Sequence, residues 1–430
     1  MKIVLVTLGC KLNQAETELL SRRFREEGHS IVASTDDADI YILNTCSVTH
    51  TADAKSRQLL RKIHRRNPDV KLVVTGCYAQ QAVETLKQIE GVTVIVGNDD
   101  KLNLPDLLKE RGFLTKSKQS EPPGFEEEIS GSRIRSFIRI QDGCSNFCSY
   151  CIVPFVRGGE KSLPVLDIIN QIKDRVSHGI KEIVITGTEI GRYNNNGINL
   201  QKLTERILLE TEIQRLRLTS LQPDEITSGL LELWNDKRLC PHFHVSLQSG
   251  SDSVLRRMNR RYDTAIFRNT VSLIRSRLPD VAITTDIITG FPGETEEEYQ
   301  TSLNMCLEME FARIHVFPYS RRPGTAAALM PGQVPDSVKT QRNQNLGIVS
   351  KKCAELYRRG FTGRTMDVLW ETRSGGLWSG YTGNYIRVYS KSKCNLVNRI
   401  TQATLQNLYK DGMWGTIEGE IHPQVLPAKD

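Results

Sequence analysis

Short runs of apolar, mostly β-branched residues alternate with stretches of helical length along most of this 430-residue chain. Such an alternation is typical of βα units, in which helices connect parallel strands and cover the faces of their sheet. A chain of this length holds about two to four domains, each long enough to bury a core. We therefore predict an α/β protein and exclude a small disulfide-stabilised scaffold.

The first predicted domain covers residues 1–114 and contains a doubly wound parallel sheet. Its strands are expected at residues 3–8, 40–43, 72–75 and 92–96, with a weaker strand at 31–33. Residues 115–132 lose this periodicity and are rich in Pro, Gly, Ser and charged residues. Their composition predicts a linker.

The second predicted domain, residues 133–360, holds six strand candidates separated by sequence of helical length. They are residues 137–140, 182–186, 215–219, 243–247, 281–288 and 312–317. Six βα units in succession predict a partial (β/α)6 barrel. Thr295 and Glu298 form a capping box that marks the start of one helix, and residues 335–360 are expected to form another.

The last predicted domain, residues 361–430, is a small β-barrel. Strand-like runs separated by Gly and Asn are found at residues 366–370, 377–381, 385–389 and 414–421. Eight aromatic residues lie among basic ones in this domain: Phe361, Trp370, Trp378, Tyr381, Tyr385, Tyr389, Tyr409 and Trp414. They suit stacking on unpaired RNA bases, but the core of a small barrel would need aromatic residues as well.

The charge of the chain gives a second indication of a nucleic-acid partner. The net charge of +7 is weak evidence by itself. Residues 55–66 hold six basic side chains and no acidic one, and Arg57, Arg61 and Arg65 share one helical face. A phosphate-binding surface and an ordinary solvated helix face both fit this pattern.

The apolar run at residues 3–8 is followed by Gly9, Cys10 and the charged Lys11. Six residues are too few for the apolar core of an export signal. No apolar run approaches the roughly 18 residues that a membrane span needs. We therefore expect a cytoplasmic protein without a membrane partner, in which the ten cysteines are reduced thiols available for metal binding or catalysis.

Three cysteines form a CxxxCxxC motif directly after the first strand of the predicted barrel: Cys144, Cys148 and Cys151. Three thiolates are one ligand short of a closed tetrahedral zinc site, and no His lies in the loop. An iron–sulfur cluster with one open iron fits this motif. Zinc with a distant fourth ligand is the alternative.

Three further cysteines, Cys10, Cys46 and Cys77, each follow a predicted strand of the N-terminal sheet. The carboxyl ends of parallel strands share one edge of the sheet, where doubly wound folds bind ligands. We therefore predict a second three-cysteine iron–sulfur cluster, with three buried structural cysteines as the alternative.

The remaining cysteines occur singly and are expected to be structural: Cys240, Cys306, Cys353 and Cys394. His242 and His244 flank Phe243 at the start of a strand, where we expect polar side chains rather than metal ligands. The sequence contains no Walker loop, HExxH motif or nucleophile elbow.

The CxxxCxxC loop after the first barrel strand resembles that of the radical S-adenosylmethionine (SAM) enzymes. The resemblance implies a 4Fe–4S cluster on Cys144, Cys148 and Cys151, whose open iron binds the methionine amino and carboxylate groups of SAM. It also implies a one-electron donor of the flavodoxin or ferredoxin type. One electron then cleaves SAM and yields a 5′-deoxyadenosyl radical.

Other residues resemble later motifs of that family. Tyr150 occupies the aromatic position before the third cysteine, whose backbone meets adenine. Gly187-Thr188-Glu189 resembles the GGE motif, with Thr188 as a departure and Glu189 placed to receive the methionine ammonium. Gln248 and Asp286 lie where contacts to ribose or to the methionine carboxylate are expected, although both suit structural strand-end roles.

The segments TLGCKLNQAE, LNTCSVTHTADAKSRQLLRK and VTGCYAQ resemble the N-terminal domain of the methylthiotransferases, a radical SAM branch with an auxiliary cluster. The last seventy residues look like its TRAM-like RNA-binding barrel. Within the branch, GCKLNQAE, ADAKSRQ, HVSLQSGSDSVLRRMNRRY and FPYSRRPGTAA look like the subgroup that acts on N6-threonylcarbamoyladenosine next to the tRNA anticodon, at position 37.

The resemblance thus implies a tRNA methylthiotransferase with SAM and two 4Fe–4S clusters, the second on Cys10, Cys46 and Cys77. Alternative substrates are N6-isopentenyladenosine in tRNA and a ribosomal-protein aspartate. A non-catalytic RNA-binding protein with structural zinc is the alternative from another class. The sequence leaves the oligomeric state open, with a monomer favoured.

Overall fold

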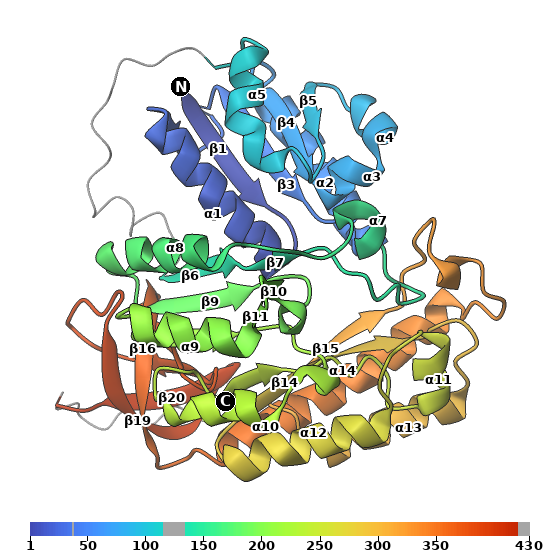
Figure 1. Cartoon of the computed structure of the whole chain (residues 1–430), viewed down its shortest axis with the longest axis vertical. Coiled ribbons are helices and arrows are strands. Elements are labelled where there is room, and N and C mark those ends of the chain that lie inside the picture. Colours follow the sequence, from blue (N-terminus) through green and yellow to red (C-terminus); the bar gives the residue numbers. More distant parts are fainter. Residues whose placement is uncertain (37, 115–133, 420–430) are drawn as a thin grey trace.

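The N-terminal sheet has five parallel strands in the order β2-β1-β3-β4-β5 (Figure 1). The computed structural model describes residues 1–36, 38–114 and 134–419 of the chain. The strands are β1 (Lys2–Thr7), β2 (Ser30–Ile31), β3 (Ile40–Thr45), β4 (Lys71–Gly76) and β5 (Val92–Val96). All five predicted strands are present.

Helices cover both faces of this sheet, as a doubly wound fold requires. They are α1 (Lys11–Glu26), α2 (His50–Arg66), α3 (Cys77–Gln81), α4 (Val83–Lys87), η1 (Lys101–Asn103) and α5 (Leu104–Glu110). Leu20 and Phe24 of α1 join one buried cluster with residues of α5, whereas Leu60 and Ile63 of α2 join the cluster on the other face. Each face is thus packed by its own apolar stripe.

The six predicted barrel strands are also present, in two parallel three-stranded sheets (Figure 1). They are β6 (Arg135–Arg139), β9 (Glu182–Thr186), β12 (Arg215–Leu218), β13 (His242–His244), β14 (Ala282–Thr289) and β15 (Arg313–Pro318). Single bridges, such as the one between Leu221 and Val245, connect the two sheets. The partial barrel and the α/β class are therefore confirmed.

Helices pack on the outer face of these strands around one large core. The longer ones are α8 (Val165–Ser177), α9 (Leu200–Glu210), α12 (Thr264–Arg277), α13 (Glu296–Glu308) and α14 (Asp336–Arg359). The short helices are α7 (Val153–Arg157), α10 (Ser228–Glu232) and α11 (Asp252–Arg257). Short strand pairs are β7 (Gln141–Asp142) with β8 (Lys161–Ser162), and β10 (Asn194–Asn195) with β11 (Ile198–Asn199).

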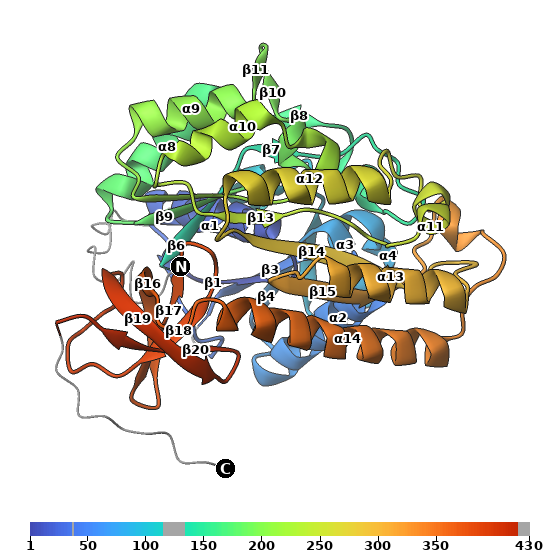
Figure 2. The ribbon, with the colours of Figure 1, turned by 90° about the horizontal axis from the view of Figure 1, so that it is seen from below.

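The predicted capping box and final barrel helix are both confirmed. The Glu298 backbone N–H donates to the Thr295 hydroxyl at 3.2 Å, and the Thr295 N–H donates back to the Glu298 carboxylate at 3.0 Å. Helix α14 matches the predicted stretch, and the strands of the C-terminal barrel lie beside its end (Figure 2).

The C-terminal strands close into a barrel in the order β16-β17-β18-β20-β19. They are β16 (Thr365–Ser374), β17 (Leu377–Thr382), β18 (Arg387–Ser390), β19 (Ile400–Tyr409) and β20 (Gly412–Ile417). The sequence analysis missed β19, because its centre buries only Ala403 and Leu405 among Thr, Gln and Asn. The strand expected at 385–389 begins at Arg387, since Tyr385 adopts a φ of 67° in the preceding turn.

The predicted linker at 115–132 lies wholly outside the described residues. The strand expected at 414–421 ends at Ile417, and the last two residues of that prediction also lie outside the described residues. The predicted domain boundaries stay predictions. In the described part of the chain, no helix is long and apolar enough to cross a membrane.

A buried cluster of charges joins the N-terminal domain to the barrel. Glu16 on α1 accepts hydrogen bonds from Lys101 at 2.6 Å and from Arg157 at 2.9 Å, and all three side chains are at most 3% exposed. Arg157 also donates to Asn13 at 2.5 Å and to Asp142 at 2.9 Å. Burial alone would raise the pKa of Glu16, but the charges and hydrogen bonds of Lys101 and Arg157 lower it to about 2.

A second buried ion pair joins the same two domains. Arg322, in the loop after β15, lies 2.7 Å from the Asp53 carboxylate of α2 and donates to the Ser47 hydroxyl at 2.7 Å. Helix α1 also lies beside the barrel sheet (Figure 1), and its Ala15 packs against Phe137 and Val184 of that sheet. The domains are thus held in one relative position by buried charge pairs and apolar packing.

The C-terminal β-barrel contacts the partial (β/α)6 barrel through arginine side chains that stack on its tyrosine rings. The guanidinium of Arg217 lies 4.1 Å from the ring centroid of Tyr385, and its Nε donates to the buried Glu182 at 2.9 Å. Arg135 bonds Glu371 at 2.6 Å and the Tyr385 hydroxyl at 2.5 Å. Tyr385 is therefore part of a domain interface.

We expect Glu16→Gln to destabilise the protein by about 3–5 kcal/mol, because it leaves Lys101 and Arg157 buried without their shared counter-charge. The measurement is the thermal unfolding midpoint by circular dichroism at pH 7. Glu26→Gln, at an exposed position on the same helix, is the control and should change stability little.

The pH dependence of this difference tests the same contact. The Glu16 pKa of about 2 lies below that of an unfolded glutamate, about 4.3. Its contribution is therefore complete above the unfolded value and is lost as the pH falls toward 2. The gap between wild type and variant should shrink below about pH 4.3. A gap that stays constant down to about pH 3 would contradict the assignment.

Candidate metal-cluster site

The structure brings Cys10, Cys46 and Cys77 to the carboxyl ends of three neighbouring strands. Cys10 caps the start of α1 after β1, Cys46 follows β3 directly, and Cys77 opens α3 after β4. Burial, together with the nearby Cys10 and Cys77 thiols, raises the pKa of the Cys46 thiol to about 12. The three thiols therefore share one electrostatic environment, as predicted from strand order.

Close approach of the first two cysteines depends on Gly9. Its φ is 125°, and a Cβ there would lie 2.5 Å from the Cys46 Cβ and 3.1 Å from its Sγ. No other residue type fits that space or readily adopts that conformation. The glycine before Cys10 thus allows the two strand ends to converge.

Two asparagines orient the N-terminal thiols. The Cys10 thiol donates to the Asn13 side-chain oxygen at 3.6 Å, while the Asn98 amide donates to the Cys77 Sγ at 3.6 Å. Asn13 is itself fixed, because its amide donates to the Leu8 and Thr45 carbonyls at 3.2 and 2.9 Å. Such outer-shell hydrogen bonds are typical of metal ligands.

The loop carrying Cys144, Cys148 and Cys151 closes on itself between β7 and α7. The Cys144 N–H donates to the Gly158 carbonyl at 3.1 Å, and the Cys151 N–H donates to the Cys148 carbonyl at 3.0 Å. Burial raises the pKa of both Cys144 and Cys151 to about 12. All three thiols are only partly exposed, so a bound metal group would be shielded from solvent.

The donor set of each cysteine triplet bears on the metal that it would hold. Each triplet offers three thiols, one ligand short of a closed tetrahedral zinc site, and soft thiolates are the ligands of iron–sulfur clusters. In the described ranges, the one group with three ligand atoms within 4.8 Å of one another is a different one, His244, Asp286 and His315.

Glu189 lies at the cysteine loop, where the sequence analysis placed it. It is 2% exposed and accepts hydrogen bonds from the Asn146 amide at 2.7 and 2.6 Å and from the Cys144 thiol at 3.2 Å. Glu225 lies beside it, and burial, together with the Glu189 charge, raises the pKa of Glu225 to about 8. Glu225 is therefore largely protonated at pH 7, and the Glu189 carboxylate is the anionic group of the two that can receive an ammonium, with Arg192 3.3 Å from Glu225.

Arg260 donates hydrogen bonds to two residues in the middle of the CxxxCxxC loop. Its Nη1 donates to the Cys148 Sγ at 3.2 Å and to the Tyr150 hydroxyl at 3.5 Å, and its Nη2 donates to Gln222. The Tyr150 ring packs against a buried cluster that includes Met258 and Phe291. Arg260 therefore brings a fixed positive charge next to a predicted cluster ligand.

The two triplets lie on either side of one domain contact. Cys77 packs against Ile152 and Val156, and Ile152 directly follows Cys151. The same helix, α7, ends at Arg157, whose charge acts on Cys10 and pairs with α1. Two cysteine sites far apart in the sequence are thus neighbours in space.

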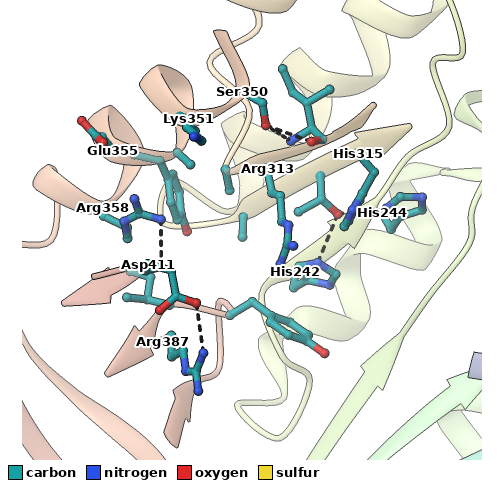
Figure 3. Close-up of a pocket in the computed structure, with 18 of the residues that line it drawn as sticks. His242, His244, Arg313, His315, Ser350, Lys351, Glu355, Arg358, Arg387 and Asp411 are labelled. Carbon is teal, nitrogen blue, oxygen red and sulfur yellow. Dashed lines mark hydrogen bonds and ion pairs between the residues drawn. The ribbon is translucent and has the colours of Figure 1, made fainter. Parts of the chain in front are cut away.

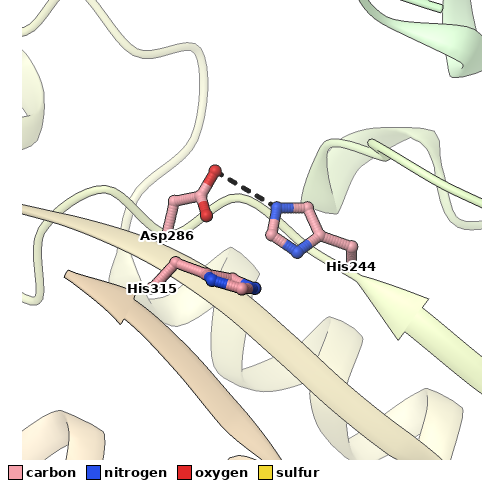
Figure 4. A group of neighbouring side chains, drawn as sticks. All are labelled: His244, Asp286 and His315. Atoms are coloured by element: carbon pink, nitrogen blue, oxygen red, sulfur yellow. Dashed lines mark hydrogen bonds and ion pairs between the residues drawn. The ribbon is translucent and has the colours of Figure 1, made fainter. Parts of the chain in front are cut away.

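His242 and His244 line a cavity on the inner side of the barrel strands (Figure 3). His242 bonds the Thr284 hydroxyl at 3.2 Å, and its ring lies 4.8 Å from that of Tyr385. His244 Nε2 lies 3.2 Å from the Asp286 carboxylate, with the His315 ring beside them (Figure 4). Hydrogen bonds thus account for both histidines.

Gln248 and Asp286 lie on adjoining strands. Gln248 has a φ of 67°, and its N–H donates to the Asp286 carbonyl at 2.8 Å. The Asp286 side chain points to His244 and His315 inside the barrel. Glu189 thus contacts the cysteine loop, of which Tyr150 is a part, and the SAM contacts of Glu189, Tyr150, Gln248 and Asp286 all stay predictions.

The sequence analysis missed Asn146, Arg157, Glu225 and Arg260. Asn146 lies inside the cysteine motif, so its position was a usable indication. Arg260 lies in the basic NRRY segment, which has the composition of an exposed surface. Arg157 and Glu225 reach the site only through tertiary packing.

The aromatic residues of the C-terminal barrel divide into three groups. Phe361, Trp370 and Trp378 are buried in its core, whereas Tyr381 and Tyr385 face the cations of the domain interface. Tyr389, Tyr409 and Trp414 form an edge-to-face series with centroids 5.3 and 5.4 Å apart. Only the last group, with Tyr409 and Trp414 half-buried, can present ring surface to a base.

The basic helix α2 presents four exposed cations that no described acidic side chain pairs within 4.0 Å: Lys55, Arg61, Lys62 and Arg65. The other two are engaged, because Arg57 donates to the Tyr78 hydroxyl at 2.6 Å and Arg66 pairs with Asp36 at 2.5 Å. Most of the predicted basic surface is therefore available to phosphates.

Comparisons with known proteins cover almost the whole chain. Residues 2–97 match the model described as Uncharacterized protein family UPF0004, and residues 138–306 match the Radical SAM superfamily. Threonylcarbamoyladenosine tRNA methylthiotransferase MtaB of Bacillus subtilis is 35% identical across 96% of this chain and 97% of that protein. Its namesake from Thermotoga maritima is 37% identical across 90% and 91% of the two chains.

A more distant relative and a solved structure are similar to this chain over most of its length. The tRNA-2-methylthio-N(6)-dimethylallyladenosine synthase of Endomicrobium trichonymphae is 31% identical across 96% of this chain and 100% of that protein. The structure of the radical S-adenosylmethionine methyltransferase TsrM from Kitasatospora setae, with cobalamin and a 4Fe–4S cluster bound, superposes with a TM-score of 0.54. At 14% identity, with 88% of this chain and 80% of that chain covered, it shares the fold.

We expect Arg260→Met to lower the reduction potential of a cluster on Cys144, Cys148 and Cys151 by about 60–130 mV. Loss of a charged hydrogen bond to sulfur, about 1.5–3 kcal/mol, destabilises the more negative reduced state. The measurement is an anaerobic redox titration followed by electron paramagnetic resonance, in a Cys46→Ala background. Arg261→Met, at the exposed neighbouring position, is the control, and equal potentials in both variants would contradict the role of Arg260.

Proposed function

This chain belongs to the radical SAM methylthiotransferase family, and from that premise we propose that it converts N6-threonylcarbamoyladenosine at tRNA position 37 into its 2-methylthio derivative. One observation carries the proposal: the two cysteine triplets meet across the buried contact of Cys77 with Ile152. The chain is a transferase of sulfur-containing groups that uses SAM and two 4Fe–4S clusters.

The six cysteines supply the ligands in this proposal. Cys144, Cys148 and Cys151 hold the SAM-binding cluster, and Cys10, Cys46 and Cys77 hold the auxiliary one. When bound, the first cluster and SAM supply a radical strong enough to break an inert adenine C–H bond, and the auxiliary cluster supplies or carries the sulfur.

In this proposal the protein side chains bind SAM and orient the cysteine loop. Glu189, held by two hydrogen bonds from Asn146, receives the methionine ammonium, and Tyr150 lines the adenine side of the loop. Gln248 and Asp286 provide contacts from the facing strands. Arg260 positions Cys148 and Tyr150 without touching substrate.

The tRNA is held by separate surfaces. The exposed cations of α2 attract phosphates, while Tyr409 and Trp414 offer ring surface for unpaired bases. A one-electron donor of the flavodoxin or ferredoxin type completes the reaction, and the protein acts as a monomer in the cytoplasm.

Three alternatives fit less well. The dimethylallyladenosine synthase named above is a more distant relative than the two threonylcarbamoyladenosine enzymes, at 31% against 35% and 37% identity. The segment GCKLN around Cys10 also resembles the threonylcarbamoyladenosine subgroup rather than those acting on isopentenyladenosine or a protein aspartate. A non-catalytic structural zinc protein fits less well, because the relatives of 35% and 37% identity are named as methylthiotransferases.

The substrate is tested by mass spectrometry of hydrolysed tRNA from a strain lacking this protein, with and without a restored copy. We expect 2-methylthio-N6-threonylcarbamoyladenosine to disappear and to return on complementation. Its persistence in the deletion strain would overturn the substrate. Loss of the isopentenyl analogue instead would identify the other tRNA base.

The cysteine assignment is tested by two substitutions after anaerobic reconstitution. Wild type should bind about eight iron atoms, and Cys148→Ala and Cys46→Ala about four each. Cys148→Ala should abolish reductive SAM cleavage, whereas Cys46→Ala should retain cleavage and lose thiolation. Cys394→Ala, a single exposed cysteine, is the control. Wild-type SAM cleavage by Cys148→Ala would refute the assignment.

A further inference from the structure

A cavity of about 880 Å³ lies where strands β13–β15, helix α14, the C-terminal barrel and the start of α1 meet (Figure 3). Its size suits a nucleoside with a substituent. Lys11 is the one described residue of the N-terminal domain in its lining, and it directly follows Cys10. The cavity therefore reaches the start of α1, one residue beyond Cys10 in the sequence.

The lining of this cavity is strongly basic. Its formal cations outnumber its carboxylates by six to two: Lys11, Arg313, Lys351, Arg358, Arg387 and Lys410 against Glu355 and Asp411. Asp411 is already engaged, because it pairs with Arg387 at 3.0 Å and accepts from the Tyr389 hydroxyl at 2.5 Å. The cavity thus has excess positive charge on its inner side.

Lys11 is a partly buried cation of this lining that lacks a counter-ion. Within the described ranges it makes no hydrogen bond and no ion pair, and its Nζ lies 6.0 Å from the centroid of the Tyr385 ring. Asp286 acts on it electrostatically, but the Asp286 carboxylate is bonded to His244 at 3.2 Å. An ammonium shielded from water without a counter-ion marks a place for an anion.

One further cation, Arg313, and one hydrogen-bonding imidazole, His315, lie on β15. Burial lowers the pKa of His315 to about 4, so its ring is neutral at pH 7. Arg313 on β15 lines the cavity and, among the described residues, has no ion-pair partner within 4.0 Å. His315, two residues along the strand, shares its face, and its ring lies close to Asp286 and His244. Lys11, Arg313 and His315 therefore present donors from two domains to one space.

We propose that Lys11, with Arg313 and His315, forms a subsite for the carboxylate of the threonylcarbamoyl group. The inference rests on the proposed function and deepens it. The threonyl substituent carries a carboxylate and the isopentenyl substituent carries none, so the charges of Lys11 and Arg313 select between the two bases, and His315 adds a neutral hydrogen-bonding group. In this proposal the substituent lies in the cavity, and the adenine lies toward the N-terminal triplet, because Lys11 directly follows Cys10.

The test uses reconstituted protein and three anticodon stem-loop RNAs that differ at one base. They carry N6-threonylcarbamoyladenosine, its threonine methyl ester, or N6-isopentenyladenosine. Fluorescence anisotropy gives Kd, and mass spectrometry of product gives kcat/KM. Wild type should favour the free acid over the ester by about 10- to 100-fold in both, the usual value of a charged hydrogen bond.

Lys11→Met should remove that preference by raising Kd and KM for the free acid to the level of the ester. Lys352→Met, an exposed position on α14 outside the cavity lining, is the matched control and should keep the preference. Arg313→Met provides a second variant on a different element, and it should reduce the preference even if Lys11→Met fails to bind iron.

The outcomes separate the two proposals. Equal use of acid and ester by wild type would overturn the subsite but leave the threonylcarbamoyladenosine function intact. An equal loss with acid and ester in both variants would show a structural role and also overturn the subsite. Turnover of the isopentenyl RNA alone would overturn the proposed function itself.

Discussion

The shared pairing of Glu16 with Lys101 and Arg157 is the interaction on which the rest of the structure depends. Arg157 ends the short helix that follows the CxxxCxxC loop, and Glu16 lies on the helix capped by Cys10. Because all three charges are buried, any rotation of one domain against the other would leave an unpaired charge in the interior. The ion pair thus fixes the relative position of two cysteine triplets, the first of which ends at Cys77 and the second of which begins at Cys144.

Much of the fold was predictable from local pattern. The positions of Cys10, Cys46 and Cys77 at one sheet edge followed from strand order alone, since parallel strands carry their carboxyl ends together. Strand β19 was not predictable, because its burial of Ala403 and Leu405 depends on partners across a closed barrel. Arg157 and Arg322 could not be assigned either, as each meets its carboxylate only after distant segments have packed. A basic residue in sequence gives no indication of whether it will be exposed or buried beside an acid.

The C-terminal barrel shows how one composition serves several purposes. Trp370 fills the core, Tyr385 stacks on Arg217, and only Tyr409 and Trp414 keep ring surface for RNA. Aromatic content by itself therefore overstated the surface available for bases. The same reservation applies to charge, because two of the six cations in the 55–66 segment are engaged within the protein.

Because the two triplets belong to different domains, they are also synthesised one after the other during translation. Cys10, Cys46 and Cys77, the glycine that lets two of them converge, and all five strands of their sheet are complete by Val96. Glu189 and Arg260, which surround the other triplet, are synthesised much later. The sheet that carries the N-terminal triplet is thus complete early in translation, whereas Asn98, Ile152 and Arg157, which contact or act on its cysteines, and the partners of the second triplet are added later.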